Sequence, residues 1–266
     1  MSKSKKSGPK VLLLDIETAP ILAHVWGIWQ ENVGLNQIKK DWHILSWAAK
    51  WLDEDKMFYQ DNRKAGKIDD DSKILQGIWD LMDEADIIVT HNGKKFDEKK
   101  LNTRFIINGL SKPSSYKHID TLQIAKKHFA PTSFKLEHLA KILKVKFQKS
   151  QHKKFPGFAL WEACLAGIDS AWKEMEHYNK QDVLVLEAVF KKLRPWATTL
   201  PNFAVYYDGH QHVCSCGSKT FKKNGFDYTN SSKFQRYKCK KCGAETRDAQ
   251  NLLSREKKNS LRRNVK

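Results

Sequence analysis

The chain has 266 residues, of which 40% are hydrophobic and 11% aromatic, enough for one sizeable folded domain and a small second one. This composition argues against global disorder, and no apolar run reaches the length of about 18 residues that a transmembrane helix needs. The net charge of +18 favours a polyanionic partner, most commonly nucleic acid, over a soluble protein that is merely rich in lysine.

The positive charge is concentrated near the C-terminus. Residues 206–266 contain 15 basic and 5 acidic residues, so this last quarter of the chain carries more than half of the excess. Residues 1–10 are rich in Lys and Ser, and we expect a disordered basic tail there. The apolar run that follows is too short for a secretory signal, so we expect a cytoplasmic protein without membrane association.

Hydrophobic periodicity predicts an α/β domain over residues 11–200. In chain order we expect a strand over 11–15, a β-hairpin over 43–52 and 57–60, a helix over 71–85, a strand over 86–92, and helices over 96–110, 120–129, 133–143 and 169–192. Strands that gather early and helices that dominate later are typical of a sheet flanked by helices.

Carboxylates recur at three points of this pattern. Asp15 and Glu17 alternate along the first strand, so they project from one face, where a divalent cation between them would offset their repulsion. Asp97 falls in the first turn of a helix, a position that an acidic residue also takes because of the helix dipole. Asp182 shares an inward helix face with Tyr178. Each feature alone is common, but together they predict a metal site.

The segments DIET (15–18), HNGKKFD (91–97) and YNKQD (178–182) resemble the three motifs of the DnaQ-like, or DEDD, 3′–5′ exonucleases. The resemblance spans roughly residues 11–195 and implies a ribonuclease-H-like mixed sheet flanked by helices. It also implies two Mg²⁺ or Mn²⁺ ions and release of nucleoside monophosphates from the 3′ end. The implied metal ligands are Asp15, Glu17, Asp97 and Asp182, with Asp97 acting partly through water.

Two neighbouring residues compete for the position that orients the nucleophilic water in this family. Tyr178 lies four residues before Asp182 and His177 lies five, and the family uses both spacings. On an unbroken helix, Tyr178 is about 40° from Asp182 around the axis and His177 is about 140° away. Helix geometry therefore favours Tyr178, with His177 as the alternative if the helix begins only after it.

Other polar residues of the motifs have weaker assignments. Thr18, His91 and Asn92 are candidate substrate-binding residues, although His91 is equally well explained as a structural histidine. Asp120 could be a further acidic residue of the site, but we expect it to cap the helix that Thr121 begins.

Four of the five cysteines form two close pairs, Cys214 with Cys216 and Cys239 with Cys242. In a chain without an export signal, this pattern predicts one structural Zn²⁺ held by four thiolates rather than disulfides. The first pair is one residue closer than usual, so His212 is an alternative ligand to Cys214.

The segment 212–248 resembles the zinc ribbons attached to transposases and other DNA-handling proteins. We expect a linker over 201–211 before it and a basic tail over 249–266 after it. Cations and aromatics alternate in the ribbon, as on a surface that follows phosphates, and its candidate substrate-binding residues are Lys222, Lys223, Arg236, Tyr237 and Lys238. A solubilising surface on a protein-binding module is the alternative.

The expected substrate is single-stranded nucleic acid, with DNA favoured over RNA. Alternatives are an RNA-trimming exonuclease of the same fold, a catalytically silent nucleic-acid-binding module and a structure-specific endonuclease. The complete acidic set argues against a silent module. Replication or repair proteins are the further partners that the resemblance implies.

Overall fold

The computed structural model describes residues 8–29, 32–146, 154–209 and 211–262. Two compact units are present, Lys10–Phe190 and a unit that contains Lys191–Lys266. Most of the basic tail predicted over 1–10, and the last four residues of the tail predicted over 249–266, lie outside the described residues.

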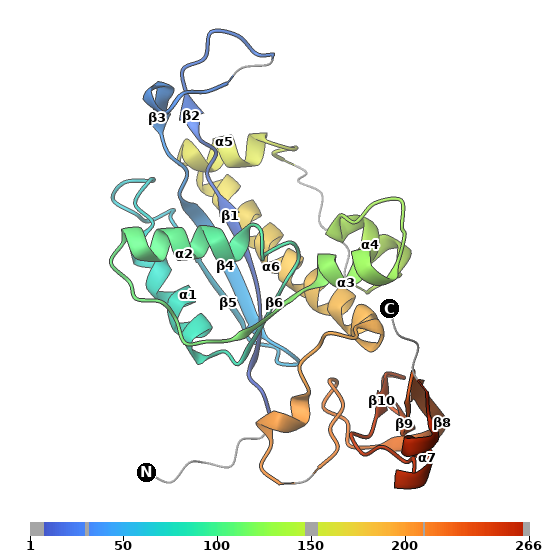
Figure 1. The fold of residues 1–266 in the computed structure, drawn as a ribbon. Helices are drawn as coiled ribbons and strands as arrows, with labels where there is room; N and C mark the ends of the chain where they lie inside the picture. Colours follow the sequence, from blue (N-terminus) through green and yellow to red (C-terminus); the bar gives the residue numbers. More distant parts are fainter. Residues whose placement is uncertain (1–7, 30–31, 147–153, 210, 263–266) are drawn as a thin grey trace. The chain divides into compact units, whose positions relative to one another are not determined.

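Five strands form one mixed sheet within the described part of the first unit, in the order β5-β4-β1-β6-β7 (Figure 1). β1 is central, antiparallel to β4 and parallel to β6. Its residues Leu12, Leu13 and Leu14 are all buried, because helices cover both faces of the sheet. The strands are β1 (Val11–Thr18), β4 (Ile44–Trp51), β5 (Met57–Asp61), β6 (Ile87–Thr90) and β7 (Lys117–Asp120).

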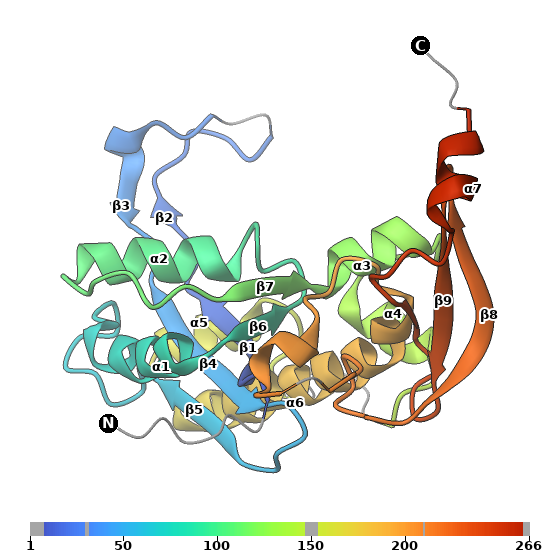
Figure 2. The same ribbon diagram turned by 60° about the horizontal axis from the view of Figure 1, so that its bottom comes forward.

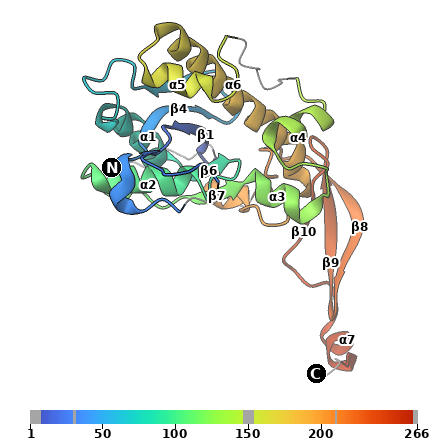
Figure 3. The same ribbon diagram turned by 90° about the horizontal axis from the view of Figure 1, so that it is seen from above.

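Helices lie on both sides of this sheet. When the molecule is seen from above, α1 (Ser72–Glu84) and α2 (Asp97–Ile107) lie on one side, and α5 (Ala159–Leu165) and α6 (Asp169–Leu193) on the other (Figure 3). α3 (Thr121–His128) and α4 (Leu136–Ile142) follow β7 along the chain. This arrangement confirms the predicted α/β fold, a mixed sheet flanked by helices.

The turn after β6 explains the HNG segment. Asn92 adopts a φ of 70°, which Asn tolerates better than most residues. A Cβ on Gly93 would lie 2.3 Å from the Thr90 hydroxyl oxygen, so no larger side chain fits there. This tight turn brings Asp97 to the first position of α2, beside β1.

Neither β7 nor α5 was expected from the sequence. β7 is a short edge strand in which Lys117 and His118 interrupt the apolar pattern, and α5 has only seven residues. The helix predicted over 120–129 begins at Thr121, and the Asp120 carboxylate accepts a hydrogen bond from the Leu122 backbone. The predicted cap is therefore confirmed.

A hairpin arm connects β1 to β4. It contains β2 (Leu22–Ala23), the 3-10 helix η1 (Leu35–Gln37) and β3 (Ile38–Lys40), and β2 pairs with β3 in antiparallel fashion. The arm leaves the sheet where β1 ends (Figure 1). The sequence did not predict its pairing, because neither strand is longer than three residues.

The second unit contains a three-stranded antiparallel sheet in the order β10-β9-β8 (Figure 1). Its hydrophobic cluster consists of Cys214, Cys216, Cys239 and Ala244, with Phe221 and Cys242 packed against them. So small a core needs additional stabilisation, such as a metal. The elements are η2 (Arg194–Trp196), η3 (Phe203–Tyr206), β8 (Phe221–Thr229), β9 (Ser232–Cys239), β10 (Glu245–Arg247) and α7 (Arg255–Ser260).

Candidate functional site

Three of the four predicted carboxylates converge at the end of β1. One oxygen from each of Asp15, Glu17 and Asp182 lies within 4.8 Å of the other two. Strand alternation places Asp15 and Glu17 on the same face. α6 lies against that face and contributes Asp182, which is only 4% exposed. Residues that are about 165 positions apart in the chain thus form one acidic cluster.

The donor chemistry of this acidic cluster fits a hard divalent cation. Three carboxylates this close repel each other, and a cation between them would offset the repulsion. Only oxygen ligands converge here, which suits Mg²⁺ or Mn²⁺ better than Zn²⁺. Asp15, Glu17 and Asp182 are therefore the residues that would hold the predicted metal.

Asp97 lies beside the acidic cluster, outside the set of three oxygens. Its Oδ1 accepts a hydrogen bond of 3.2 Å from the Ile16 N–H. The pairing of β1 with β6 ends at Leu13, three residues before Ile16. The Asp97 carboxylate therefore accepts the hydrogen bond of a backbone N–H that β6 does not pair. Burial raises the pKa of Asp97 to about 7. Asp97 is thus fixed to the peptide that links Asp15 to Ile16.

Tyr178 faces the acidic cluster from α6. The helix is continuous from Asp169 to Leu193 and therefore runs through His177, which satisfies the geometric condition that favours Tyr178. The Tyr178 ring is 7% exposed and packs edge-to-face on Trp161, with 5.9 Å between ring centroids. His177 is exposed on the helix surface.

The Tyr178 hydroxyl is held in its protonated form. Burial raises the pKa of Tyr178 well above its usual value, and the negative charges of Asp182, Glu17 and Asp15 raise it further. At neutral pH the phenol can consequently donate a hydrogen bond to an oxygen placed near the cluster.

Asn179 is a site residue that the sequence analysis missed. Its side chain is fully buried, its Nδ2 donates to Asp15 Oδ2 at 2.8 Å, and its Oδ1 accepts from the Ser46 hydroxyl at 3.1 Å. The amide therefore holds one carboxylate of the cluster while it ties α6 to β4. The available signal was its spacing, because a residue three positions before Asp182 shares its helix face.

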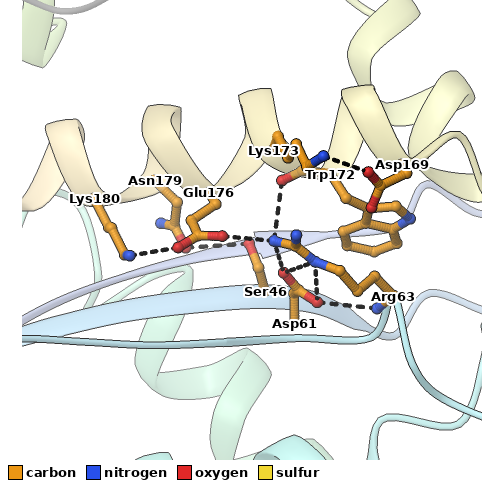
Figure 4. A network of polar contacts seen from close by, with 9 residues as sticks. All are labelled: Ser46, Asp61, Arg63, Asp169, Trp172, Lys173, Glu176, Asn179 and Lys180. Carbon is orange, nitrogen blue, oxygen red and sulfur yellow. Dashed lines mark hydrogen bonds and ion pairs between the residues drawn. The ribbon is translucent and has the colours of Figure 1, made fainter.

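A polar network extends from this point along α6 (Figure 4). The Arg63 guanidinium contacts the Asp61 carboxylate at 2.6 Å and the Glu176 carboxylate at 2.7 Å. Glu176 also pairs with Lys180 at 2.5 Å on the same helix. These contacts tie the helix that carries Tyr178 and Asp182 to the end of β5.

The remaining motif residues have structural contacts. His91 bonds the Thr121 hydroxyl through Nδ1 and the Phe134 carbonyl through Nε2, both at 2.9 Å, as expected of a structural histidine. The Asn92 N–H donates to Asp120 at 2.9 Å. Thr18 lies next to Glu17, where the register between β1 and β4 shifts. Of these three candidates, Thr18 is nearest in sequence to the acidic cluster.

The four paired cysteines form a second cluster. Their sulfur atoms all lie within 4.8 Å of one another, with 3.5 Å between Cys214 and Cys242 and 3.6 Å between Cys216 and Cys239. A tetrahedral zinc site with Zn–S bonds of about 2.3 Å has sulfur–sulfur edges of about 3.8 Å. The arrangement thus fits a Zn²⁺ ion, which these four residues would hold.

The backbone around Cys239 favours its thiolate, whereas burial raises the pKa of Cys242. Burial alone would raise the pKa of the Cys239 thiol, but the N–H groups of Cys242 and Lys241 outweigh it and bring the pKa to about 6. Gly243 follows the last cysteine directly and adopts a φ of 79°, a left-handed conformation that glycine takes without steric cost.

His212 is not part of the cysteine cluster as the described residues form it. Its ring stacks on Tyr237, with 6.3 Å between centroids. The predicted contacts on the ribbon surface differ in availability: Lys222 and Lys223 are exposed on β8, whereas Arg236 and Tyr237 donate hydrogen bonds to Asn224 and Asp248. Lys238 is partly exposed on β9.

Comparisons with known proteins add a family match. A model of the RNase_H superfamily matches residues 12–194. No curated protein matches the chain. Among solved structures, the family B DNA polymerase from the hyperthermophilic archaeon Pyrobaculum calidifontis is similar, at 16% identity and a TM-score of 0.49. The alignment covers 74% of this chain and 27% of the polymerase, so the chain spans about a quarter of that protein's length. In the described residues, every helix is too short or too polar to cross a membrane.

We expect Cys216→Ser to remove zinc from the protein, because one thiolate of the tetrahedron is lost. Zinc content can be measured by elemental analysis and by a chromogenic chelator after thiol modification. Cys164→Ser is the matched control, since Cys164 is a buried cysteine of the other unit, and it should keep one zinc per chain. His212→Ala should keep it as well. Equal zinc content in all three variants and the wild type would contradict the site.

We expect Mn²⁺ to raise the melting temperature of the wild-type protein, because the ion binds the folded acidic cluster. At 100 times the Kd the stabilisation is about 2.7 kcal/mol, or several degrees. Asp182→Asn should melt higher than the wild type without metal, since a repulsion is removed, and should respond less to Mn²⁺. The control is Asp80→Asn, a change at an exposed residue of α1. Identical Mn²⁺ responses of the two variants would contradict metal binding at the cluster.

Proposed function

Since the chain belongs to the RNase_H superfamily, we propose that it is a metal-dependent 3′–5′ exonuclease of the DnaQ-like, tyrosine-containing type. The observation that carries the proposal is the convergence of Asp15, Glu17 and Asp182 with the Tyr178 side chain pointing to the same place. The motifs DIET, HNGKKFD and YNKQD supply these residues, together with Asp97, in the order of that group.

The proposed reaction is hydrolysis of the terminal phosphodiester. Water attacks the phosphorus, the bond from phosphorus to the 3′ oxygen of the preceding nucleotide breaks, and a nucleoside 5′-monophosphate leaves. Two divalent ions, when bound, would stabilise the attacking and leaving oxygens. Asp15, Glu17 and Asp182 would hold them, and Asp97 would contribute through water.

This chain's own residues supply orientation. The protonated Tyr178 hydroxyl would donate a hydrogen bond to the attacking water or to a phosphate oxygen, which fixes its direction of approach. Asn179 keeps Asp15 in one orientation, and the Ile16 N–H does the same for Asp97. A site prepared in this way has little reorganisation left to make during the reaction.

We further propose single-stranded nucleic acid as the substrate, with DNA favoured over RNA, and replication or repair proteins as further partners. The high positive charge supports a nucleic-acid substrate. The exonuclease domain would comprise residues 11–200 and the zinc ribbon residues 212–248. The exposed Lys222 and Lys223 support a role of the ribbon in holding phosphates.

The direct test uses single-stranded DNA and RNA labelled at the 5′ end, with Mg²⁺ or Mn²⁺. We expect a ladder that shortens from the 3′ end on DNA, and loss of the ladder in Asp15→Ala because a metal ligand is gone. Faster shortening of RNA would identify an exoribonuclease instead. A binding module is the correct conclusion if the wild type and Asp15→Ala bind equally and neither cuts.

A matched pair of variants tests the tyrosine assignment. Tyr178→Phe keeps the ring packed on Trp161 but removes the hydroxyl, so kcat should fall by about 100-fold or more while KM changes little. His177→Ala, on the exposed side of α6, should retain wild-type kcat. The opposite ranking in single-turnover rates would assign the role to His177.

A further inference from the structure

The arm between β1 and β4 exposes large apolar side chains. Trp26 is 97% exposed and Trp29 84%, whereas Trp47 and Trp172 of the same unit are 2% and 1% exposed. Ile28 and Leu35 are also more than four-fifths exposed. Several large exposed apolar side chains on one short segment indicate a binding surface, whereas single apolar residues scattered over a protein surface do not.

The arm follows β1, which carries Asp15 and Glu17, and leads into β4, the antiparallel partner of β1. Glu17 pairs with Ser46 and Thr18 with Ile44, and a few residues further the pairing resumes as Leu22 with Lys40. Trp26 follows Glu17 by nine residues, so even a fully extended chain keeps it within about 30 Å of the cluster. Figures 1 and 2 show the arm projecting beyond the end of β1.

The chemistry of the arm fits a single strand of nucleic acid with unpaired bases. Indole rings stack on any base, which gives binding without sequence preference. Lys39 and Lys40 are exposed on β3 of the same arm and add positive charge to it, in a chain with a net charge of +18, and Lys40 also lies 3.9 Å from the Asp69 carboxylate. A nucleic acid strand is complementary to both the charge and the aromatic rings of the arm, since its phosphates can contact lysines and its bases can stack on tryptophans.

We propose that the arm is a base-stacking surface on which Trp26 and Trp29 hold the substrate strand a few nucleotides from the bond that is cut. This inference rests on the proposed function, because it assumes that the strand enters the acidic cluster. The arm would raise the local concentration of the 3′ end at the cluster and would take no part in the chemistry.

The test compares binding of fluorescently labelled oligothymidylate with binding of an abasic oligonucleotide of equal length, both in EDTA so that nothing is cut. Phosphate contacts treat the two alike, whereas stacking requires bases. The wild type should bind oligothymidylate about 10-fold tighter or more. The preference is the ratio of the Kd for the abasic oligonucleotide to the Kd for oligothymidylate. In the double variant Trp26→Ala, Trp29→Ala this ratio should fall toward one. In Trp26→Phe, Trp29→Phe most of the preference should remain.

The control is Trp196→Ala, which removes a tryptophan that is 61% exposed in the other unit and should keep the preference. An unchanged preference in the double alanine variant would overturn the inference. It would also be overturned if that variant changed sedimentation from dimer to monomer while the preference stayed, since the arm would then bind a second copy.

A separate substrate distinguishes failure of the arm from failure of the proposed function. The p-nitrophenyl ester of thymidine 5′-monophosphate is too small to reach the arm, so its hydrolysis reports the acidic cluster alone. Hydrolysis by the wild type with an unchanged base preference in the double alanine variant leaves the function and rejects the arm. Absence of hydrolysis with a lost preference rejects the function and retains a base-stacking arm.

Discussion

The position of α6 on the sheet is the constraint on which the site depends. A helix turns by about 100° per residue, so a slip of one residue would turn Tyr178 and Asp182 away from β1. Three polar contacts oppose such a slip: Glu176 with Arg63, Asn179 with Ser46 and Asp15, and Glu187 with Lys50. They are spaced along the helix on both sides of Tyr178 and Asp182, so they fix the rotation of the helix and its position along its own axis.

Apolar packing and polar contacts have different tasks in this arrangement. Trp172, Met175 and Val189 of α6 are buried, and their burial stabilises the packed helix, but the hydrophobic effect is non-directional and does not by itself select one rotation of the helix. The buried pair of Lys50 and Glu187 adds little net stability, because desolvation offsets its attraction. Breaking it by removing one partner would nevertheless cost about 3–5 kcal/mol. We infer that such contacts serve chiefly to select one register of α6.

The sequence was sufficient for features that have a local cause. The apolar run of β1, the cap at Asp120, and the side of the helix on which Tyr178 lies all follow from periodicity and short-range hydrogen bonding. Periodicity places Asn179 on the helix face of Asp182, but its contacts could not be found in this way, because its partners Asp15 and Ser46 are more than 130 residues away and only tertiary packing brings them together. β7 was missed for a similar reason, since its four residues form a strand only by pairing with β6. The distances between ligand atoms in the acidic cluster and in the cysteine cluster likewise could not be predicted from the sequence, because they depend on the folded structure.

The pairing of β1 with β4 has a register irregularity between Glu17 and Thr18. Glu17 pairs with Ser46 and Thr18 with Ile44, so Leu45 is an extra residue on β4 and its side chain is fully buried in the core beside α5 and α6. Such bulges bend a strand and redirect the side chains that follow. On one side of it, helices cover both faces and every apolar residue of β1 is buried. On the other side the strands leave the sheet, and Trp26 and Trp29 lie exposed in the bends that follow β2. This irregularity beside Glu17 therefore marks where the chain passes from the five-stranded sheet, which carries Asp15 and Glu17, toward the separate two-stranded sheet of the arm.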